Sequence, residues 1–423
     1  MKIISITGTK GKTTITRAIS YTLKNYGENT LRVDTDGHYV NEKQKSTLLE
    51  SKQLFGLVPT VCPGKYLLAM KKYCPNYTAI LETAIGSSGK GGLGYRKHNI
   101  GIFSNVFEDH LGASKRLKTR KDIAKAKNFI FSAIGGENGY AVFNADDKLV
   151  CSQLNCISTK RKVTLVPVGY NLNFFNTKKH LDNNGIVITK KDNYLILKSK
   201  NKTINLLDIH DIDWTFKGNF NPSIYNLMLI LGGLYSFNEG NLPKTKKCIT
   251  VLKNYKPAKH GGRLTLLENK QGVKIMVDYA HEKYSLNEVA TLVKKNSNGK
   301  TIGVVRLAPD RTDKMIVETG QFIADSFDSF IVYDKIDGIS KKRYVSTGLT
   351  PTREKGDVSK LFLQGILSKQ SKKNAVRIII EENAIKKAAE IANPGDTVII
   401  ICGDDHKKTI SYIKKYFKAS FVK

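Results

Sequence analysis

A glycine-containing turn near the start of the chain has the composition of a phosphate-binding loop. It lies between an apolar run at residues 2–6 and a helical pattern at residues 15–26, and it consists of Gly8, Thr9, Lys10, Gly11, Lys12, Thr13 and Thr14. Backbone N–H groups of such a turn, together with the N-terminus of the following helix, can bind phosphate oxygens. Lys12 would then neutralise the β and γ oxygens, and the Thr13 hydroxyl would bind Mg²⁺. The general P-loop pattern also has a glycine five residues before Gly11, where this chain has Ile6.

Two further polar residues follow predicted strands. Glu82 comes directly after the apolar run at residues 78–81, and His110 comes after the run at residues 100–104. In open α/β sheets, ligands bind at the carboxyl ends of the strands. A carboxylate and an imidazole beside a triphosphate are ligand types for one or two Mg²⁺ ions. For either residue taken alone, a solvated position at a strand end is the simpler interpretation.

A second glycine-rich stretch at residues 89–94 formally matches the pattern G-x-G-x-x-G. A dinucleotide-binding turn requires a strand that leads directly into it and a helix that starts at its last glycines. Here residues 86–90 intervene, and residues 95–99 are polar. We therefore interpret this stretch as a substrate loop and reject a dinucleotide site.

The elements that would position these residues follow an alternating α/β pattern. Short β-branched runs at residues 2–6, 78–81, 100–104 and 140–143 alternate with helical patterns, which is typical of a parallel sheet. Residues 165–214 change to short alternating strands with Asn-Gly and Asp-Asn turns and predict a small antiparallel insertion. A long apolar helix is predicted at residues 222–236.

A second domain is predicted after a Pro- and Gly-containing linker. The linker spans residues 255–263, and we expect one domain at residues 1–255 and another at residues 256–423. In the second domain, β-branched runs separated by helix-length segments predict another doubly wound α/β sheet. These runs lie at residues 273–277, 301–306, 329–333, 376–380 and 397–402.

Length and composition are those of a globular chain with more than one domain. The 423 residues exceed the roughly 100–200 of a typical domain. With 40% hydrophobic and 25% charged residues, disordered and collagen-like classes are excluded. The longest apolar stretch, at residues 227–235, is shorter than the ~20 residues of a membrane helix, and no signal peptide is evident. Six scattered cysteines without a C-x-x-C pair indicate reduced thiols, so we expect a cytoplasmic protein.

The net charge is the unusual feature of the composition. The chain has 69 Lys plus Arg against 37 Asp plus Glu, a formal charge of +32, which favours an anionic partner. A general lysine bias of the source organism is an equally good interpretation, because the excess is spread over the whole length. Arginine is sparse, and this disfavours sequence-specific nucleic-acid binding.

The order of the motifs resembles the central domain of the Mur ligase superfamily, and the C-terminal half of cyanophycin synthetases looks most similar. The similarity covers nearly the whole chain. It includes residues 8–17, 34–37, 82–84 with 92–95, 108–112, 126–131 and 144–147, and in the second domain residues 262–263, 277–281 and 310–313. It implies a two-domain α/β fold, with a P-loop nucleotide-binding central domain and a smaller Rossmann-like C-terminal domain.

The resemblance also implies roles for individual residues. Lys12 and Thr13 would bind phosphate and Mg²⁺, Glu82 and His110 would be metal ligands, and Lys127 matches a family lysine that is carbamylated in many members and then ligates metal. A plain surface lysine is the alternative for Lys127. Lys12, His110 and Lys127 would thus be the catalytic residues. The nucleotide contacts implied are Asn221 at the adenine, with Ile224 where a second asparagine is usual, and Arg263, Asp278, Asp310 and Arg311 from the second domain.

Departures from the family pattern limit what can be inferred about substrates. The chain begins at the nucleotide-binding strand, so we expect neither the N-terminal domain with which peptidoglycan Mur ligases bind a UDP-sugar nor the ATP-grasp half of cyanophycin synthetase. Residues 85–90 also replace an Arg-rich stretch of cyanophycin synthetases, which puts arginine addition to poly-aspartate in doubt.

We therefore expect an ATP-dependent, ADP-forming amide ligase that uses ATP and Mg²⁺. It would activate an acidic peptide or polymer as an acyl phosphate and join it to an amino acid donor. We expect neither a membrane nor a nucleic acid as a partner. A folylpolyglutamate or poly-γ-glutamate type ligase is one alternative, and a non-catalytic nucleotide-binding partner subunit is another. A homo-oligomer and a separate partner subunit are both left open.

Overall fold

The computed structural model describes residues 1–47, 50, 53, 58–71, 76–85, 93–108, 111, 116–135, 138–257, 263–335, 343–345, 350–403 and 405–422. The chain divides into two compact units. The first contains residues 1–107 and 119–257, and the second contains residues 108–118 and 258–423. No helix in the described ranges is long and apolar enough to cross a membrane.

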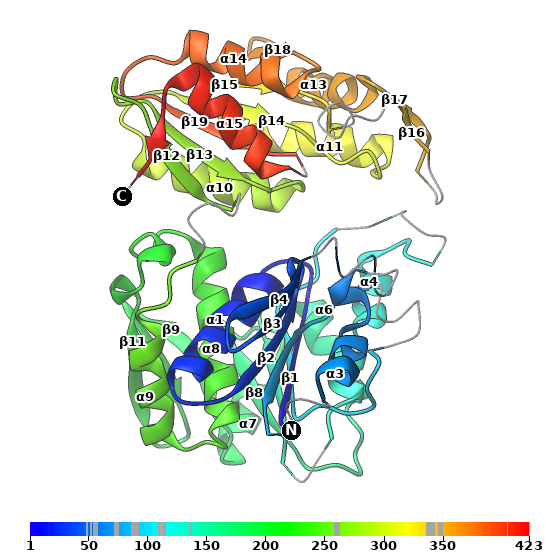
Figure 1. The fold of residues 1–423 in the computed structure, drawn as a ribbon, viewed down its shortest axis with the longest axis vertical. Coiled ribbons are helices and arrows are strands. Elements are labelled where there is room, and N and C mark those ends of the chain that lie inside the picture. The colour runs from blue at the N-terminus through cyan, green and yellow to red at the C-terminus, as the bar shows by residue number, and fades with distance from the viewer. Residues whose placement is uncertain are drawn as a thin grey trace. The chain divides into compact units, whose positions relative to one another are not determined.

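The first unit is built on one large sheet with β1 near its centre (Figure 1). Neighbouring strands from β8 to β2 run parallel, and the strands beyond β9 and beyond β2 are antiparallel. The carboxyl ends of β1, β5 and β6 therefore meet at one edge, where polar residues can be gathered. In sheet order the strands are β11 (Thr203–Asp208), β10 (Tyr194–Lys198), β9 (Val187–Lys191), β8 (Val163–Val168), β7 (Gly139–Asn144), β6 (Ile100–Phe103), β1 (Ile3–Thr7), β5 (Thr78–Glu82), β2 (Thr30–Asp34), β3 (Gly37–Val40) and β4 (Lys43–Thr47).

Helices cover both faces of this sheet (Figure 1). One face carries α1 (Lys12–Asn25), α8 (Asn221–Phe237) and α9 (Leu242–Leu252). The other carries α3 (Pro63–Lys71), α4 (Arg120–Ala126), α5 (Phe129–Ser132) and α6 (Lys148–Cys151), and α7 (Thr177–Asp182) lies beyond β8 in the chain. Short 3-10 helices complete the connections, namely η1 (Pro59–Val61), η3 (Ser152–Cys156), η4 (Ile209–Asp211) and η5 (Asp213–Thr215).

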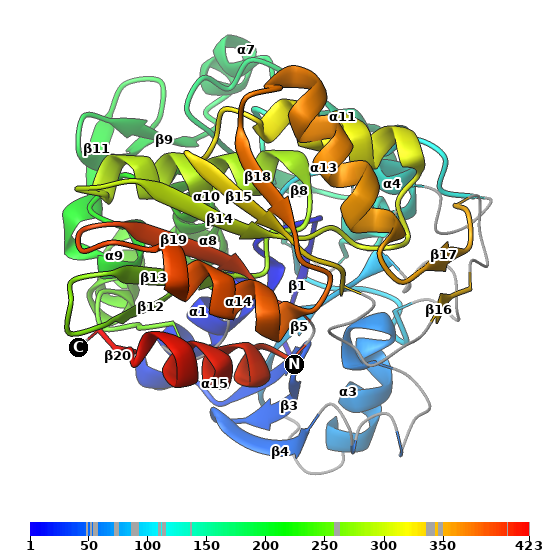
Figure 2. The same ribbon diagram turned by 90° about the horizontal axis from the view of Figure 1, so that it is seen from above.

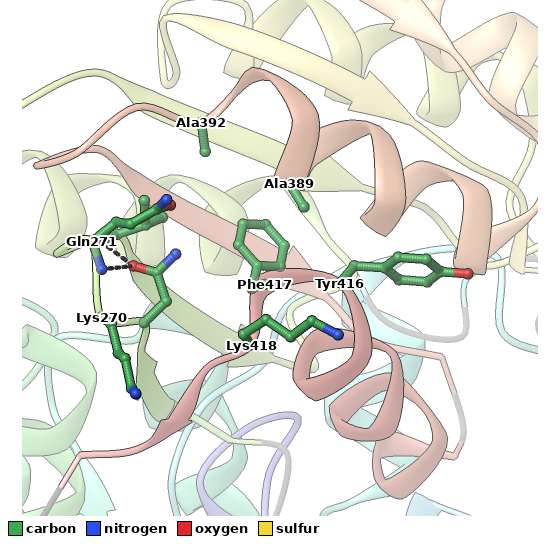
Figure 3. Close-up of a pocket in the computed structure, with 9 residues that line it drawn as sticks. Lys270, Gln271, Ala389, Ala392, Tyr416, Phe417 and Lys418 are labelled. Atoms are coloured by element: carbon green, nitrogen blue, oxygen red, sulfur yellow. Dashed lines mark hydrogen bonds between the residues drawn. The ribbon is translucent and has the colours of Figure 1, made fainter.

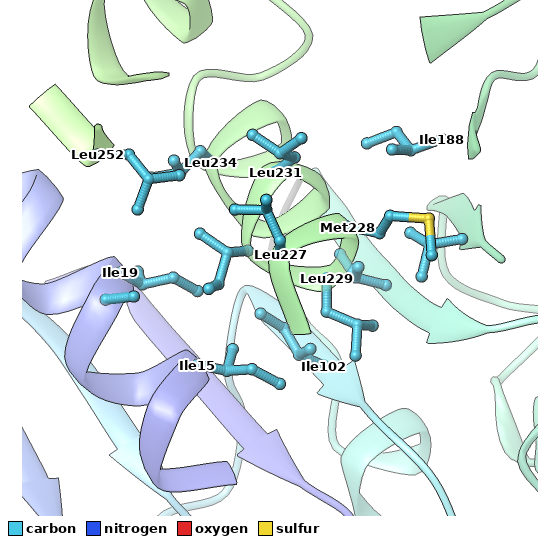
Figure 4. Packing of buried hydrophobic residues seen from close by; sticks show 14 of the residues in the cluster. Ile15, Ile19, Ile102, Ile188, Leu227, Met228, Leu229, Leu231, Leu234 and Leu252 are labelled. Atoms are coloured by element: carbon cyan, nitrogen blue, oxygen red, sulfur yellow. The ribbon is translucent and has the colours of Figure 1, made fainter. Parts of the chain in front are cut away.

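Helix α8 lies in the middle of the first unit's hydrophobic core. It is apolar on nearly all sides, as expected of a buried helix, and packs against Ile15 and Ile19 of α1 and Ile102 of β6 (Figure 4). A Cβ on Gly233 would lie 2.9 Å from both Ile19 and Ile102, so glycine permits this close approach. On the other face, Phe103 packs on Phe131 of α5. Successive residues of β6 thus pack against helices on opposite faces of the sheet, and this fixes the register of the strand.

The second unit is a doubly wound sheet of mainly parallel strands. In sheet order these are β18 (Asn374–Arg377), β15 (Ser329–Val332), β14 (Thr301–Val305), β19 (Thr397–Ile401), β13 (Lys274–Asp278), β12 (Thr265–Glu268) and β20 (Ser420–Phe421), and among these strands the antiparallel pairings are those of β12. Helices α14 (Glu381–Ile391) and α15 (His406–Phe417) share a core with one face, and α10 (Lys283–Asn296), α11 (Asp313–Ile323) and α13 (Asp357–Lys369) lie on the other (Figure 2). A separate short hairpin joins β16 (Arg343–Tyr344) and β17 (Arg353–Glu354).

The observed elements agree with the predicted α/β rhythm, with several differences. Strands β2 and β12 were not among the predicted runs. Strand β8, at the start of the predicted antiparallel insertion, pairs parallel with β7, so the antiparallel part begins after β9. The strand predicted at residues 376–380 ends at Arg377, because Ile380 is already the N-cap of α14. The hairpin of β3 and β4 was not predicted, since exposed polar residues in β4 give no apolar run.

Candidate active site

The phosphate-binding turn occupies the predicted place between β1 and α1. Gly8 has φ +142° and Gly11 has φ +85°, conformations that favour glycine. A Cβ on Gly8 would lie 1.9 Å from Oγ of Ser104, and a Cβ on Gly11 would lie 2.1 Å from Oδ1 of Asn226. Gly11 is also the N-cap of α1, so no side chain caps the first turn of that helix. The N–H groups of this turn are therefore available to bind a ligand.

The segment after β6 holds this turn in place. Ser104 Oγ donates to the Lys10 carbonyl (2.7 Å), and Asn105 Oδ1 accepts from the Lys10 N–H (2.8 Å). The Thr9 N–H donates to the Asn105 carbonyl (2.9 Å), and Thr9 Oγ1 accepts from the Phe107 N–H (3.0 Å). The turn is therefore fixed in advance of ligand binding, which lowers the entropic cost of ordering it.

The lysine and threonines of the turn are positioned for phosphate. Nζ of Lys12 donates to the Thr9 carbonyl (3.1 Å), so its ammonium group lies back over the turn. Thr13 is buried, and Thr14 is half-buried. The turn thus combines a cation, backbone donors and a buried hydroxyl, which suits a nucleotide phosphate.

Glu82 ends β5 beside this turn and is 2% exposed. Its Oε1 accepts a hydrogen bond from the Thr35 hydroxyl (3.2 Å), whereas Oε2 is buried with no hydrogen-bond partner among the described residues. Burying an ionised carboxylate with a single neutral donor is unfavourable. A divalent cation would satisfy the second oxygen, because Mg²⁺ prefers carboxylate ligands. The residues present therefore fit Mg²⁺ bound with nucleotide phosphate.

Of the other two predicted metal ligands, the structure describes Lys127. This residue is the C-cap of α4 and is 3% exposed, so it is buried and the surface alternative is excluded. His110 lies outside the described residues, as do residues 86–92, which include most of the predicted substrate loop. Within the described part of the chain, no three His, Cys, Asp or Glu side chains gather into a metal site.

Asp147 and Arg120 hold the backbone of the segment that follows β6. Asp147 Oδ2 accepts from the Val106 N–H (2.8 Å), and Nη2 of Arg120 donates to the Val106 carbonyl (2.6 Å). The other Asp147 oxygen caps α6 through the N–H groups of Leu149 and Val150. Burial raises the pKa of Asp147, although these backbone donors oppose the shift. The family motif at residues 144–147 includes Asp147, but the motif alone does not indicate this contact.

The structure places the predicted adenine-contacting asparagine and its neighbour in the first turn of α8. Asn221 is the first residue of α8 and is exposed, and its Oδ1 accepts from the Tyr170 hydroxyl (3.3 Å). Ile224 is fully buried in the core. From α8, Asn226 also approaches the phosphate-binding turn, and the sequence motifs did not identify it. The periodicity of the helix is the sequence pattern that could have indicated it, since Asn226 lies between buried positions of α8.

The second unit's predicted residues differ in burial and in their contacts. The two oxygens of Asp278 accept from the N–H groups of Leu264 (2.9 Å) and Ala280 (2.7 Å). Arg311 is 4% exposed and pairs with Asp310 (2.8 Å), whereas Arg263 is exposed. Asp278 is the last residue of β13, and the Asp310–Arg311 pair follows β14. These are two strands of one sheet that end at the same edge.

A pocket of about 470 Å³ in the second unit lies away from these residues (Figure 3). Residues 269–273, which precede β13, form one side, and the last residues of α14 and α15 form the rest. Asp278 is at the opposite end of β13, so the pocket is at the other edge of the sheet. The described residues that line it include no carboxylate, imidazole or thiol, and we do not assign it to catalysis.

The comparisons with known proteins agree with this geometry. Residues 6–232 match the family described as Mur ligase middle domain, and residues 262–403 match the one described as Mur ligase, glutamate ligase domain. The cyanophycin synthetase of Nostoc sp. is 28% identical over 418 residues, which are 97% of this chain and 42% of that protein. The chain thus spans about two fifths of that relative's length.

Two further relatives extend the comparison. The UDP-N-acetylmuramoyl-L-alanyl-D-glutamate–2,6-diaminopimelate ligase of Phocaeicola vulgatus is 26% identical over 423 residues, covering 99% of this chain and 76% of that protein. The solved structure of a bifunctional folylpolyglutamate synthase/dihydrofolate synthase complexed with AMPPNP and Mn ion, from Yersinia pestis, has a TM-score of 0.61 at 15% identity. It covers 98% of this chain and 88% of the other, and it shows likeness of fold.

Proposed function

The chain belongs to the Mur ligase family, whose members are ATP-dependent acid–amino acid ligases that form ADP, and from this premise we propose that it catalyses amide-bond formation of this type. The observation that carries the proposal is the pairing of two features at one sheet edge. A braced phosphate-binding turn lies beside a buried carboxylate, Glu82, whose Oε2 has no hydrogen-bond partner in the described ranges. Transfer of the γ-phosphate of ATP to a carboxylate requires a phosphate-binding turn next to a site for a divalent cation.

In the proposed reaction, an oxygen of the acceptor carboxylate attacks the γ-phosphorus of ATP, and ADP leaves. The donor amine nitrogen then attacks the acyl carbon of the acyl phosphate, inorganic phosphate leaves, and the nitrogen loses a proton. Lys12 and the N-terminus of α1 stabilise the charge that builds up on the phosphate oxygens. Glu82 would hold Mg²⁺ together with the proposed ligands Thr13, His110 and carbamylated Lys127, and this cation would neutralise phosphate charge.

The roles of the other residues are proposals of the same kind. Residues 8–14 would bind the phosphates, and Asn221, Arg263, Asp278, Asp310 and Arg311 would contact the rest of the nucleotide. Asn226 joins this group because it touches the phosphate turn. Asp278 also accepts two backbone hydrogen bonds, which shape the edge of the sheet at that position.

We propose an acidic peptide or polymer as the acceptor and an amino acid as the donor. The charge of +32 supports an anionic acceptor. A positive potential over a binding site raises the local concentration of a polyanion.

A phosphate-release screen tests the proposed function. The purified protein is incubated with MgATP and pools of acidic peptides and amino acids, and we expect release only when both an acceptor and a donor are present. Turnover with a folate or an oligo-γ-glutamate and glutamate alone would identify the folylpolyglutamate-type alternative. Nucleotide binding without turnover in any pool would contradict a ligase and favour the partner-subunit alternative.

A further inference from the structure

We propose that helix α15 and the pocket at its C-terminal end form a surface that binds an acidic peptide away from the catalytic residues. The proposal rests on the proposed function, because this peptide would be the chain of the acidic acceptor. The helix lies beyond the part of the chain that the family matches include, since the second match ends at residue 403 and α15 begins at His406.

Three exposed lysines form a row along α15. Lys407, Lys414 and Lys418 are seven and four residues apart, which places them within about 40° of one another around the helix axis. The opposite side of the helix carries Ile410 and Ile413, which are buried in the core of the second unit. None of the three lysines forms an ion pair with another described residue. This lysine row therefore carries three positive charges over about 16 Å.

The two other lysines of α15 are engaged within the protein. Lys415 forms an ion pair with Glu382 (2.9 Å), and Lys408 lies over the ring of Tyr412 (5.8 Å). Lys414, which belongs to the lysine row, lies over the ring of Phe421 (4.7 Å), and this contact orients its side chain. We therefore assign the binding of an anion to the lysine row.

The lysine row connects the two edges of the second unit's sheet. Strand β19 ends at Ile401, at the edge that also carries Asp278, and α15 begins five residues later. The helix then returns across the sheet, since Phe417 lines a pocket with residues 269–273, which precede β13. A peptide bound along the row would thus extend from the edge that carries Asp278 to the opposite edge.

The pocket lies where the lysine row ends. Its volume of about 470 Å³ is within the range of ligand pockets, ~300–1,000 Å³. Lys270 reaches it from the turn before β13 and Lys418 from the end of α15, and Ala389, Ala392 and Phe417 supply apolar surface (Figure 3). Because its described lining residues include no carboxylate, the pocket combines two cations with an apolar wall and suits the end of an anionic chain.

The spacing and the type of the cations favour a peptide over a nucleic acid. An extended peptide rises ~3.3 Å per residue, so about five residues span the lysine row and three of their side chains face the same side. Three carboxylates at alternate positions can therefore pair with the three lysines. The row contains no arginine, whose planar guanidinium is preferred in phosphate and nucleic-acid recognition.

A binding measurement tests the lysine row. The probe is a fluorescein-labelled oligo-aspartate of about eight residues, long enough at ~3.3 Å per residue to span the row and reach the pocket. Its Kd is measured by fluorescence anisotropy. We expect the triple variant Lys407→Gln, Lys414→Gln, Lys418→Gln to raise this Kd about tenfold, the combined effect of three exposed charge contacts.

A matched control removes the same charge elsewhere. Lys244, Lys246 and Lys247 are exposed on α9 in the first unit, do not line the pocket, and are too unevenly spaced to form a row on one face. Their triple substitution by Gln should change the Kd by less than about twofold. Equal weakening by the two triple variants would overturn the inference, because the total charge would then attract the peptide.

A single variant tests the pocket. Lys270→Gln changes an exposed residue of the turn and leaves α15 intact, and we expect it to raise the Kd for the oligo-aspartate about twofold to fivefold. Wild-type affinity of Lys270→Gln would remove the pocket from the proposed surface.

Two further outcomes decide the identity of the partner and the link to the proposed function. Tighter binding of a single-stranded oligonucleotide of equal charge, lost in the α15 triple variant, would overturn the assignment to an acidic peptide. The anisotropy measurement needs no turnover, so an unchanged Kd in a folded α15 variant would overturn this inference and leave the ligase proposal intact. If the melting temperature shows that the triple variant does not fold, the double variant Lys407→Gln, Lys418→Gln is measured with the same outcomes.

Discussion

At the residue scale, the phosphate-binding turn makes Lys12 the side chain on which ATP use should depend most. Its ammonium group is already held over the turn by the Thr9 carbonyl, so little rearrangement is needed when phosphate binds. We expect Lys12→Ala to lower turnover by at least ~10²-fold, the scale of losing one preorganised electrostatic group. Steady-state phosphate release measures this. Lys24→Ala, an exposed lysine in the last turn of the same helix, should be neutral, and near-normal ligation by Lys12→Ala would refute the proposed site.

Lys127 supports a second prediction at this scale. A lysine with 3% exposure is uncommon, and a carbamate would convert its cation into a metal-binding carboxylate. We expect Lys127→Ala to lose activity and a short carboxylic acid such as formate to restore part of it. Lys125→Ala, an exposed lysine on the same helix, is the control and should neither lose activity nor respond to formate. Full activity of Lys127→Ala without formate would exclude the carbamate.

At the scale of elements, His98 connects the start of β6 to α5, and we expect it to make the stability of the first unit depend on pH. Its Nε2 donates to the Ile130 carbonyl (2.9 Å), and Nδ1 is buried without a hydrogen-bond partner in the described part of the chain. Burial lowers the pKa of His98 to about 4 from 6.5. Between these two values the unfolded chain binds more protons than the folded one, so stability rises with pH across this window and is lost as pH falls through it.

The size of this effect can be measured by substitution. A shift of this extent corresponds to about 3 kcal/mol of unfolding free energy between pH 6.5 and pH 4. His98→Gln keeps an N–H donor and does not titrate, so its urea unfolding should depend less on pH by up to this amount. Equal slopes for wild type and variant between pH 4 and 6.5 would show that His98 does not couple folding to protonation.

At the scale of the whole molecule, the charge of +32 is the property that bears on substrate choice. If it attracts a polyanionic acceptor, salt should weaken the attraction as the Debye length falls from ~10 Å at 0.1 M to ~3 Å at 1 M. We expect the KM for the acceptor to rise on the order of tenfold over that range at saturating ATP. A general lysine bias, or a small neutral acceptor, predicts a constant KM. A flat response would remove the polyanion hypothesis without affecting the ligase proposal.

The sequence by itself determined the fold class and the family. The fold predicted from the resemblance, a P-loop central domain with a smaller Rossmann-like domain, is confirmed by the two sheets and by both family matches. These features could be predicted because they are local. The turn at residues 8–14 is contiguous, β-branched runs mark buried strands, and the apolar residues of α8 mark a helix buried on all sides.

Only the tertiary structure decided which side chains surround the phosphate-binding turn. Thr35 and Glu82 are 47 residues apart, Val106 and Asp147 are 41 apart, and the two contacts depend on the strand order, in which β2 neighbours β5 and β6 neighbours β7. Asn226 reaches Gly11 because glycine packing lets α8 approach the sheet closely. None of these pairings has a local pattern, since each arises when buried faces of separate elements meet and only one arrangement satisfies their packing and polar groups.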